Sequence, residues 1–292
     1  MAHSVEVVVS RPDPLGEGVI WDHRAQLVYW TNIRGPTLYR YDPVRTELLS
    51  VAVPEPLGSI ALSQGTGLLL ATKSGLYAHR VGSEFRPLVR LDEAKPNNRC
   101  NDGRCDPAGR FWVGTMSDVE RSPAGSLYCY APSGELTTWQ DNITIPNSLA
   151  WSPDGRRMYF ADTWRNLIWA YDYDLASGVP SNQRIFFDTS GNPGSPDGSA
   201  VDSDGCLWNA EYGGGRIVRY RPDGSIDLTI TLPVTQPTCV CFGGSDLRTL
   251  YITTAAQRLS AGDLARQPLA GSLLAVQVAT QGVPEARFGA AL

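Results

Sequence analysis

Residues 15–51 read LGEGVIWDHRAQLVYWTNIRGPTLYRYDPVRTELLSV and contain four short runs of β-branched and aromatic residues, separated by turn-forming residues. These runs predict strands at 18–22, 27–32, 38–42 and 47–51. The same order recurs in PNSLAWSPDGRRMYFADTWRNLIWAYDYD (146–174), followed by NQRIFFDT (182–189), and predicts strands at 148–151, 158–163, 167–172 and 184–188. The recurrence predicts a repeated four-stranded unit.

Four further segments follow the same order, so the chain contains six repeats. Equivalent positions of the six first strands lie about 40 to 50 residues apart, a spacing typical of four-stranded propeller blades. These positions are Trp21, Ala61, Cys105, Trp151, Val201 and Cys241. We therefore predict an all-β fold, in which residues 1–292 form a single six-bladed β-propeller domain with antiparallel blades around a central tunnel.

The two chain ends decide how the ring closes, because the sixth repeat lacks a clear fourth strand. The N-terminal run VEVVV (5–9) is one candidate, and its use would leave no unpaired sheet edge. The C-terminal EARF (285–288) is the alternative. Residues 256–269 interrupt the β pattern and are expected to form a loop or one helical turn.

Charge and composition exclude several classes of partner. The net charge is -5 and the 25 basic residues are scattered, which argues against nucleic acid or an anionic membrane as partner. Neither a signal peptide nor an apolar stretch of about 18 residues is visible, so a cytoplasmic protein is expected. The six cysteines are expected to be reduced. Cys239 and Cys241 are interpreted as core side chains, the alternative being a metal or redox pair.

One register of the repeats carries polar side chains. The first strand of each blade lines the tunnel, so equivalent residues converge on its axis. The positions four residues before those given above are Glu17, Leu57, Asn101, Asn147, Asp197 and Pro237. Four of the six bear side-chain oxygens. Turn chemistry is the alternative for single members, since the sequence around Asp197 resembles an ordinary Pro-Asp-Gly turn.

Two carboxylates and two amides that meet at an apolar tunnel would repel one another without a counter-charge. We therefore predict one divalent cation there. Oxygen ligands suit Ca²⁺, Mg²⁺ or Mn²⁺, and Zn²⁺ and Fe²⁺ also accept carboxylates. His3, His23 and His79 lie outside this register and are expected at the surface. A cation with open positions polarises a carbonyl and activates water, which suits hydrolysis of an activated ester.

Four stretches resemble the senescence-marker/gluconolactonase family of regucalcin-like six-bladed propellers, from residue 12 to the C-terminus. They are LGEGVIWD (15–22), NNRCNDGRCDPAGRFWVGTM (97–116), PNSLAWSPDGRRMYFADT (146–163) and PDGSAVDSDGCLW (196–208). The chain is most similar to bacterial sugar-acid lactonases such as xylonolactonases and arabinonolactonases. The resemblance implies metal-dependent hydrolysis of aldonolactones, such as xylono-, arabinono- or gluconolactone, to the sugar acid.

The resemblance also implies roles for single residues. Glu17, Asn147 and Asp197 would bind the metal, and Asp197 would also act as general base. Arg99 and Asn101, in a motif that continues with Asp102, would hold the sugar ring.

Some family members carry a substrate-contacting Glu four residues before the Gly of the following strand. Here that strand starts at Gly125, the position is occupied by Arg121, and Glu120 beside it becomes the candidate.

Two other functions fit the same fold. A metal-dependent aryl-esterase or phosphotriesterase would take bulkier, more apolar substrates, whereas the Arg99–Asn101 pair favours a polyhydroxylated one. A non-enzymatic calcium-binding propeller would need an exposed interaction surface, whereas the aromatic residues mostly occupy strand positions. Trp164 is the exception and is a candidate wall of a substrate pocket. A closed ring has no free sheet edge, so a monomer is expected.

Overall fold

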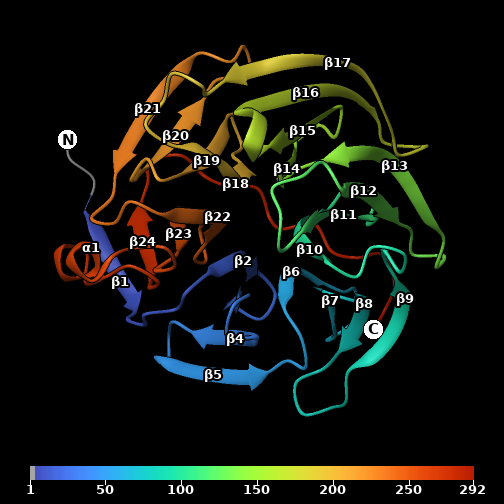
Figure 1. Cartoon of the computed structure of the whole chain (residues 1–292), viewed down its shortest axis with the longest axis horizontal. Coiled ribbons are helices and arrows are strands. Elements are labelled where there is room, and N and C mark those ends of the chain that lie inside the picture. Colours follow the sequence, from blue (N-terminus) through green and yellow to red (C-terminus); the bar gives the residue numbers. More distant parts are fainter. Residues whose placement is uncertain (1–3) are drawn as a thin grey trace.

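The computed structural model describes residues 4–292 and shows six sheets, each of four antiparallel strands, arranged in a ring (Figure 1). The first strand of each sheet in chain order, or β22 in the last sheet, lies innermost and contacts the inner strands of the neighbouring sheets. The prediction of a six-bladed β-propeller is confirmed.

The first three blades follow directly in chain order. Blade 1 contains β2 (Gly16–Asp22), β3 (Leu27–Asn32), β4 (Thr37–Asp42) and β5 (Glu47–Ala52). Blade 2 contains β6 (Leu57–Leu62), β7 (Leu68–Thr72), β8 (Gly75–His79) and β9 (Arg86–Arg90). Blade 3 contains β10 (Asn98–Cys105), β11 (Phe111–Ser117), β12 (Gly125–Tyr130) and β13 (Leu136–Ile143).

The remaining blades include the two short helices. Blade 4 contains β14 (Pro146–Trp151), β15 (Arg157–Asp162), the 3₁₀ turn η1 (Thr163–Arg165), β16 (Leu167–Asp174) and β17 (Val179–Asp188). Blade 5 contains β18 (Ser195–Val201), β19 (Leu207–Tyr212), β20 (Arg216–Tyr220) and β21 (Ile226–Thr231). Blade 6 contains β22 (Pro237–Gly243), β23 (Thr249–Thr254), α1 (Ala261–Arg266), β24 (Leu273–Gln277) and β1 (Val5–Val9).

The N-terminal strand closes the ring. β1 pairs antiparallel with β24, with Val5 opposite Val276, so both chain ends contribute to blade 6. The prediction for VEVVV is confirmed, and the alternative for EARF is wrong. Phe288 instead forms an isolated parallel bridge with Ser63 in blade 2, because the C-terminal segment crosses the ring rather than joining its edge.

Helix is scarce in the described chain. α1 begins at a capping box formed by Ser260 and Asp263, and this single short helix confirms the expectation for residues 256–269. No helix within residues 4–292 is long and apolar enough to cross a membrane.

The inner strands begin two residues earlier than predicted, at Gly16 rather than 18 and at Pro146 rather than 148. In every inner strand the pairing register shifts by a β-bulge, for example between Glu17 and Ile20. A bulge inserts one unpaired residue and re-aims the neighbouring side chains, so the ladder continues past it. The polar register therefore lies inside the strands rather than before them.

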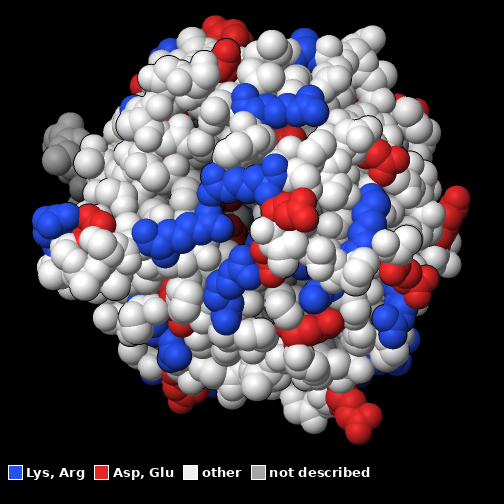
Figure 2. Space-filling view, in the orientation of Figure 1, with Lys and Arg blue, Asp and Glu red and all other residues white. Residues whose placement is uncertain are grey.

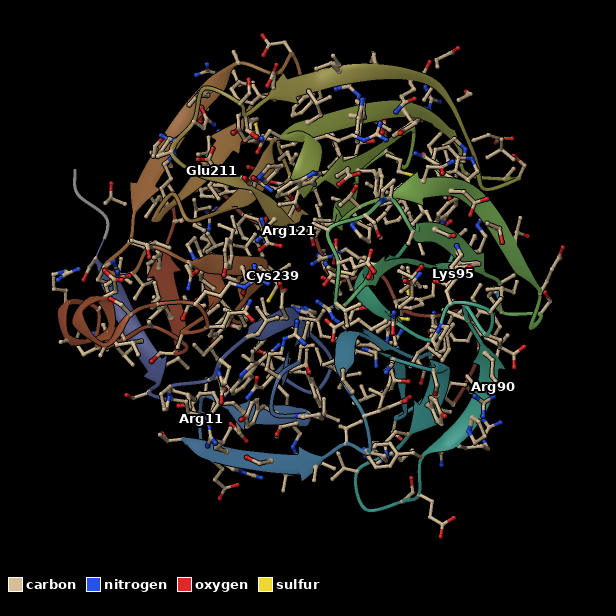
Figure 3. The ribbon with its side chains drawn as sticks, in the orientation of Figure 1. Arg11, Arg90, Lys95, Arg121, Glu211 and Cys239 are labelled. Atoms are coloured by element: carbon tan, nitrogen blue, oxygen red, sulfur yellow. The ribbon has the colours of Figure 1, made fainter. Side chains whose placement is uncertain are left out.

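The apolar core consists of six wedges, one between each pair of neighbouring blades. Burial of these faces supplies the main driving force for folding. All six cysteines are buried and free. Cys239 and Cys241 belong to the wedge between blades 6 and 1, which confirms them as core side chains, and Cys239 lies near the ring centre (Figure 3).

The histidines depart in part from their prediction. His23 is exposed as expected, and His3 lies outside the described residues. His79 is buried and stacks on Phe85 with ring centroids 4.3 Å apart, so its assignment to the surface is wrong. It lies at the end of β8 under the 80–85 loop, and burial lowers the pKa of its imidazole.

Candidate active site

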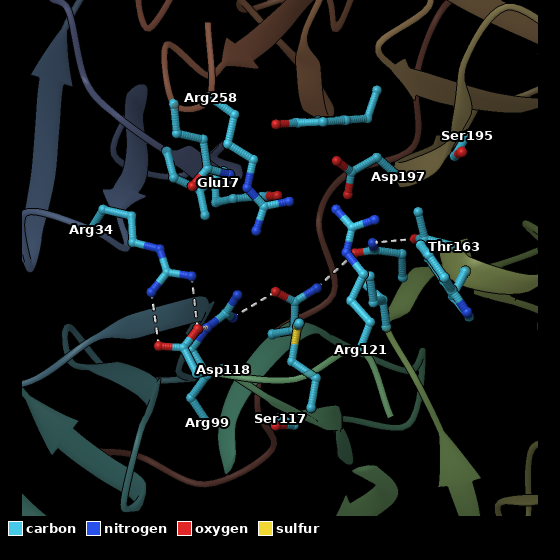
Figure 4. A pocket seen from close by; sticks show the side chains of 18 of the residues that line it. Glu17, Arg34, Arg99, Ser117, Asp118, Arg121, Thr163, Ser195, Asp197 and Arg258 are labelled. Atoms are coloured by element: carbon cyan, nitrogen blue, oxygen red, sulfur yellow. Dashed lines mark hydrogen bonds and ion pairs between the residues drawn. The ribbon is translucent and has the colours of Figure 1, made fainter. Parts of the chain in front are cut away.

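One mouth of the tunnel opens into a cavity of about 210 Å³. Its floor is formed by the inner strands of four blades, and its rim by the loops that connect strands on this face (Figure 4). Of the six residues in the predicted register, the four with side-chain oxygens line the cavity, and the apolar Leu57 and Pro237 do not. These four residues of the register are Glu17, Asn101, Asn147 and Asp197.

Local backbone geometry turns these side chains toward the tunnel. Glu17 precedes Gly18, which adopts φ 56°, a left-handed conformation that favours glycine. The Gly18 N–H donates to Glu17 Oε2 at 3.0 Å. After Asp197, a Cβ on Gly198 would lie 2.6 Å from Cys239 Sγ of the next blade. The glycines therefore allow the inner strands to pack closely at the level of the site.

Within residues 4–292 neither floor carboxylate forms an ion pair, although the charge of Arg99 acts on both. Burial, together with the charge of Asp102, raises the pKa of Glu17 to about 8. Burial and the charge of Glu17 raise the pKa of Asp197 well above its ordinary value. The Oδ1 atom of Asp197 is buried without a hydrogen-bond partner. A buried acceptor with no donor is costly, and a cation would satisfy it.

The donor set fits a cation that prefers oxygen. Glu17 and Asp197 supply carboxylates and Asn147 supplies an amide oxygen, as hard divalent ions require. Within residues 4–292 no group of three or more His, Cys, Asp or Glu side chains is placed to hold a metal, and the donor set here is two carboxylates and one amide. The site is thus poorer in negative charge than a typical all-carboxylate calcium loop.

Asn147 is oriented by its neighbours. Its Nδ2 donates to Thr163 Oγ1 at 2.7 Å, and Thr163 Oγ1 in turn donates to the Pro196 carbonyl at 2.7 Å. Its Oδ1 accepts from Asn101 Nδ2 at 3.1 Å. With its nitrogen turned away toward Thr163, Asn147 keeps its carbonyl oxygen as the available ligand atom.

Arg99 and Asn101 form one rigid unit. Arg99 Nη1 donates to Asn101 Oδ1 at 2.7 Å, and Arg99 Nε donates to Asp118 at 2.7 Å. Asn101 Nδ2 also donates to the Pro146 carbonyl at 2.9 Å. Both polar groups of Asn101 are therefore engaged with protein atoms, so its clearest structural role is to position Asn147.

Asp118 joins two arginines at the edge of the cavity. Arg34 donates to its two oxygens at 2.8 Å each, and Arg99 donates to one of these oxygens, Oδ1 (Figure 4). Burial alone would raise the pKa of Asp118, but the hydrogen bonds from Arg34 and the charge of Arg99 lower it below the ordinary value. Asp118 therefore stays ionised and shares its charge between two guanidinium groups.

Asp102 does not line this cavity. Its Oδ2 accepts the backbone N–H of Leu149 at 2.9 Å, which joins blade 3 to blade 4. Its role in the structure is to tie two inner strands together beside the floor.

A buried network that sequence reasoning missed anchors Asp197. Ser148 Oγ donates to the Asp197 carbonyl at 2.6 Å, and Asn209 Nδ2 donates to the same carbonyl at 2.9 Å. Asn209 also donates to Ser148 Oγ at 3.0 Å. Ser148 adopts φ 59°, which is rare for a residue other than glycine, and such strain tends to occur at functional sites. The position of Ser148 directly after Asn147 was the sequence signal that could have pointed to this network.

The rim comes from loops of several blades. Glu120 and Arg121 both line the cavity from the loop between β11 and β12. Trp164, 51% exposed, forms part of the wall, as its loop position suggested. Arg34, Tyr212 and Arg258 also line the cavity, and no repeat register marked them in the sequence.

Known proteins are similar to this chain along nearly all of its length. The sequence pattern of the SMP-30/gluconolactonase/LRE-like region matches residues 15–256. A 6-deoxy-6-sulfogluconolactonase from Pseudomonas putida is 37% identical over 292 residues, which cover 99% of each chain. Regucalcin from Xenopus laevis is 36% identical over 92% of each chain. The crystal structure of a calcium-binding protein, regucalcin, from Agrobacterium tumefaciens matches with a TM-score of 0.95 at 31% identity, over 99% of this chain and 98% of that one.

Proposed function

The chain belongs to the SMP-30/gluconolactonase/LRE-like family, and from this premise we propose that it hydrolyses sugar lactones with one divalent cation. The substrates we propose are aldonolactones such as xylono-, arabinono- or gluconolactone. One observation carries the proposal: four oxygen-bearing side chains from four blades meet in one cavity, where Asp197 Oδ1 has no partner. The similarity to a protein named as a lactonase supports the reaction, and that to a protein named as calcium-binding supports the cation.

Glu17, Asn147 and Asp197 are the residues that would hold the cation. Their oxygens suit Ca²⁺, Mg²⁺ or Mn²⁺, and Zn²⁺ and Fe²⁺ also accept carboxylates. When bound, such an ion supplies positive charge that polarises a carbonyl group and favours ionisation of water.

Asp197 is the residue that we propose moves the proton. Its carboxylate accepts a proton from water as the water oxygen attacks the lactone carbonyl carbon, and returns it to the ring oxygen as the carbon–oxygen bond breaks. The bonds from Ser148 and Asn209 to its backbone carbonyl hold it in place during both transfers.

Arg99 is the proposed donor to the sugar hydroxyls. Asp118 and Asn101 already fix its guanidinium group, so little conformational entropy is lost when a substrate binds. Asn101 contributes by holding Asn147 and Arg99 together. Glu120, on the rim, is the proposed acceptor for a substrate hydroxyl.

The proposal is tested with xylono-, arabinono-, glucono- and galactonolactone, by measuring acid release above the spontaneous rate. The protein is assayed before and after chelation, and after addition of Ca²⁺, Mg²⁺, Mn²⁺, Zn²⁺ or Fe²⁺ singly. We expect turnover that falls on chelation and returns with at least one ion. The same ion should raise the melting temperature of the chelated protein, because it binds the folded state only.

Glu17→Gln should remove both the thermal shift and most of the turnover, whereas Glu47→Gln, on the exposed edge strand β5, should retain both. If every metal-loaded sample leaves all the lactones at the spontaneous rate, the lactonase proposal is wrong. Hydrolysis of an aryl ester by that inactive sample would favour the esterase alternative. A thermal shift without any hydrolysis would favour a non-enzymatic calcium-binding propeller.

A further inference from the structure

Three arginines converge on the rim of the cavity from separate loops. Arg34 lies between β3 and β4, Arg121 between β11 and β12, and Arg258 between β23 and α1. Figure 2 shows basic side chains gathered around the central hollow of this face, and Figure 4 shows the three guanidinium groups directed toward it. No lysine lines the cavity.

Arg34 and Arg121 are each held by a side-chain contact, whereas Arg258 follows a backbone segment that hydrogen bonds fix. Arg34 forms the two bonds to Asp118. The Arg121 guanidinium lies 4.7 Å from the centre of the Trp164 ring, a cation–π contact. Arg258 has a backbone φ of 61°, and its neighbour Gln257 is bonded through its backbone to Pro14 and Gln236. Pre-ordered side chains lose less entropy when a ligand binds.

The rim carries more positive than negative charge. Four arginines line the cavity, counting Arg99, but two of the four lining carboxylates are the floor residues Glu17 and Asp197. That leaves Asp118 and Glu120 near the arginines, and Asp118 is shared between Arg34 and Arg99. Within the described chain, neither Arg121 nor Arg258 forms an ion pair or a side-chain hydrogen bond.

Planar guanidinium groups bind oxyanions through paired, charge-assisted hydrogen bonds, which are stronger than bonds to neutral hydroxyls. A neutral sugar lactone would offer Arg121 and Arg258 only hydroxyl and carbonyl oxygens, to which their hydrogen bonds are weaker than to an anionic group. We propose that the lactone carries an anionic group away from its ester, a sulfonate, phosphate or carboxylate, and that Arg121 and Arg258 bind it with Arg34 beside them. This inference rests on the proposed lactonase function and names its substrate class.

The test compares gluconolactone with the same lactone bearing a 6-phosphate or a 6-sulfonate, and with the lactone of a sugar diacid. Because a charge-assisted hydrogen bond adds about 1.5 kcal/mol or more, we expect kcat/KM to be about tenfold or more higher for at least one anionic lactone. The anionic lactone with the highest kcat/KM identifies which anion the rim prefers. Its KM should rise with ionic strength, because the rim is open to solvent.

Arg121→Gln and Arg258→Gln should each lower the ratio of kcat/KM for the anionic lactone to that for gluconolactone by about tenfold, mainly through KM. Arg86→Gln is the matched control, since Arg86 is exposed on the outer strand β9 and does not line the cavity. In Arg86→Gln the ratio of the two kcat/KM values should equal that of the unaltered protein.

The outcomes separate this inference from the proposed function. Equal or better hydrolysis of the neutral lactone, with a ratio insensitive to both arginine variants, would overturn the inference and leave the lactonase proposal standing. If no lactone is hydrolysed, binding of the open-chain products is measured by calorimetry. Tighter binding of 6-phosphogluconate than of gluconate, lost in Arg258→Gln, would still support an anion-binding rim, and equal binding would overturn it.

Discussion

The two mouths of the tunnel are built from the opposite ends of the same six inner strands, yet they differ in nearly every physical property. The mouth at the strand starts is a polar cavity with uncompensated carboxylates. The mouth at the strand ends is covered by the C-terminal segment, where Glu285 pairs with Arg104 at 3.1 Å and Arg287 with Asp22 at 2.9 Å. In this segment Phe288 stacks on Tyr130, with ring centroids 5.6 Å apart.

The two mouths differ in whether their buried charged groups form ion pairs. At the covered mouth the buried charges of Arg104 and Asp22 each have a partner of opposite sign, although Arg104 Nε has no hydrogen-bond partner. At the open mouth burial and the charge of Glu17 raise the pKa of Asp197, burial and the charge of Asp102 raise the pKa of Glu17, and one oxygen of Asp197 has no hydrogen-bond partner. Functional sites retain such strain because the unpaired groups await a ligand. The covered end of the propeller thus pairs its buried carboxylates with arginines, whereas the two floor carboxylates of the open end form no ion pair within residues 4–292.

The largest effect is expected at Asp197. Asp197→Asn should lower kcat/KM for the lactone by roughly 10³-fold, because it removes the proposed proton acceptor. The same change should leave the chelated protein at least as stable as the unaltered one, since it removes a buried unpaired charge. Lactone kinetics and urea unfolding in chelator measure the two effects. Retained activity at a tenth or more of the original would show that Asp197 is not the base.

At the covered mouth we expect the reverse, a loss of stability without a loss of activity. Glu285→Ala leaves Arg104 without its closest partner and should lower the free energy of unfolding by about 3 kcal/mol. Glu285→Gln keeps an acceptor and should cost less. In both variants kcat/KM should be unchanged at temperatures where they are folded. Loss of activity without loss of stability would mean that the two mouths are coupled.

A smaller effect is expected in the network beneath the floor. Ser148→Ala removes one donor to the Asp197 carbonyl and an acceptor for Asn209, and should cost about 2 kcal/mol of stability. Activity should also fall, because Asp197 loses an anchor. Ser203→Ala, at an exposed turn, is the control. Unchanged stability and activity in Ser148→Ala would contradict the anchoring role.

The smallest effect is a pH dependence at the covered mouth. Burial would raise the pKa of Asp22, but bonds from Arg287 lower it, so ionised Asp22 stabilises the fold above its ordinary pKa near 4.

That stabilisation should be lost as the pH falls through the lowered pKa. The difference in unfolding free energy between the unaltered protein and Asp22→Asn should therefore be about 1 kcal/mol at pH 7 and shrink below about pH 4. Denaturation at several pH values measures it. A difference that stays constant down to pH 3 would rule out Asp22 as the titrating group.

Much of the fold was readable because it repeats. Each blade presents the same order of strands and turns, so the six units support one another, and the register that holds Glu17, Asn101, Asn147 and Asp197 follows from that repeat. The bulges after this register were not visible, because a bulge depends on pairing with the next strand. His79 was misplaced because its burial comes from Phe85 in a nearby loop rather than from strand periodicity.

Most residues of the cavity rim could not be predicted from the repeat. Arg34, Asp118 and Arg258 lie in loops of different length, and loops carry no periodic signal. Trp164 is the rim residue that its loop position did suggest. The sequence also could not predict that both polar groups of Asn101 form hydrogen bonds, one with Arg99 and one with Asn147. Such bonds depend on distance and direction across two blades.

The sequence by itself determined the six-bladed architecture and the four polar residues at the tunnel mouth, and it narrowed the closing strand to two candidates, because strand periodicity and repeat spacing are local properties of the chain. Only the tertiary structure decided which end the C-terminal segment covers, which floor carboxylate oxygen lacks a partner, and which arginines surround the cavity. These features arise between residues far apart in the chain, where geometry in three dimensions rather than spacing in the sequence sets distance and burial.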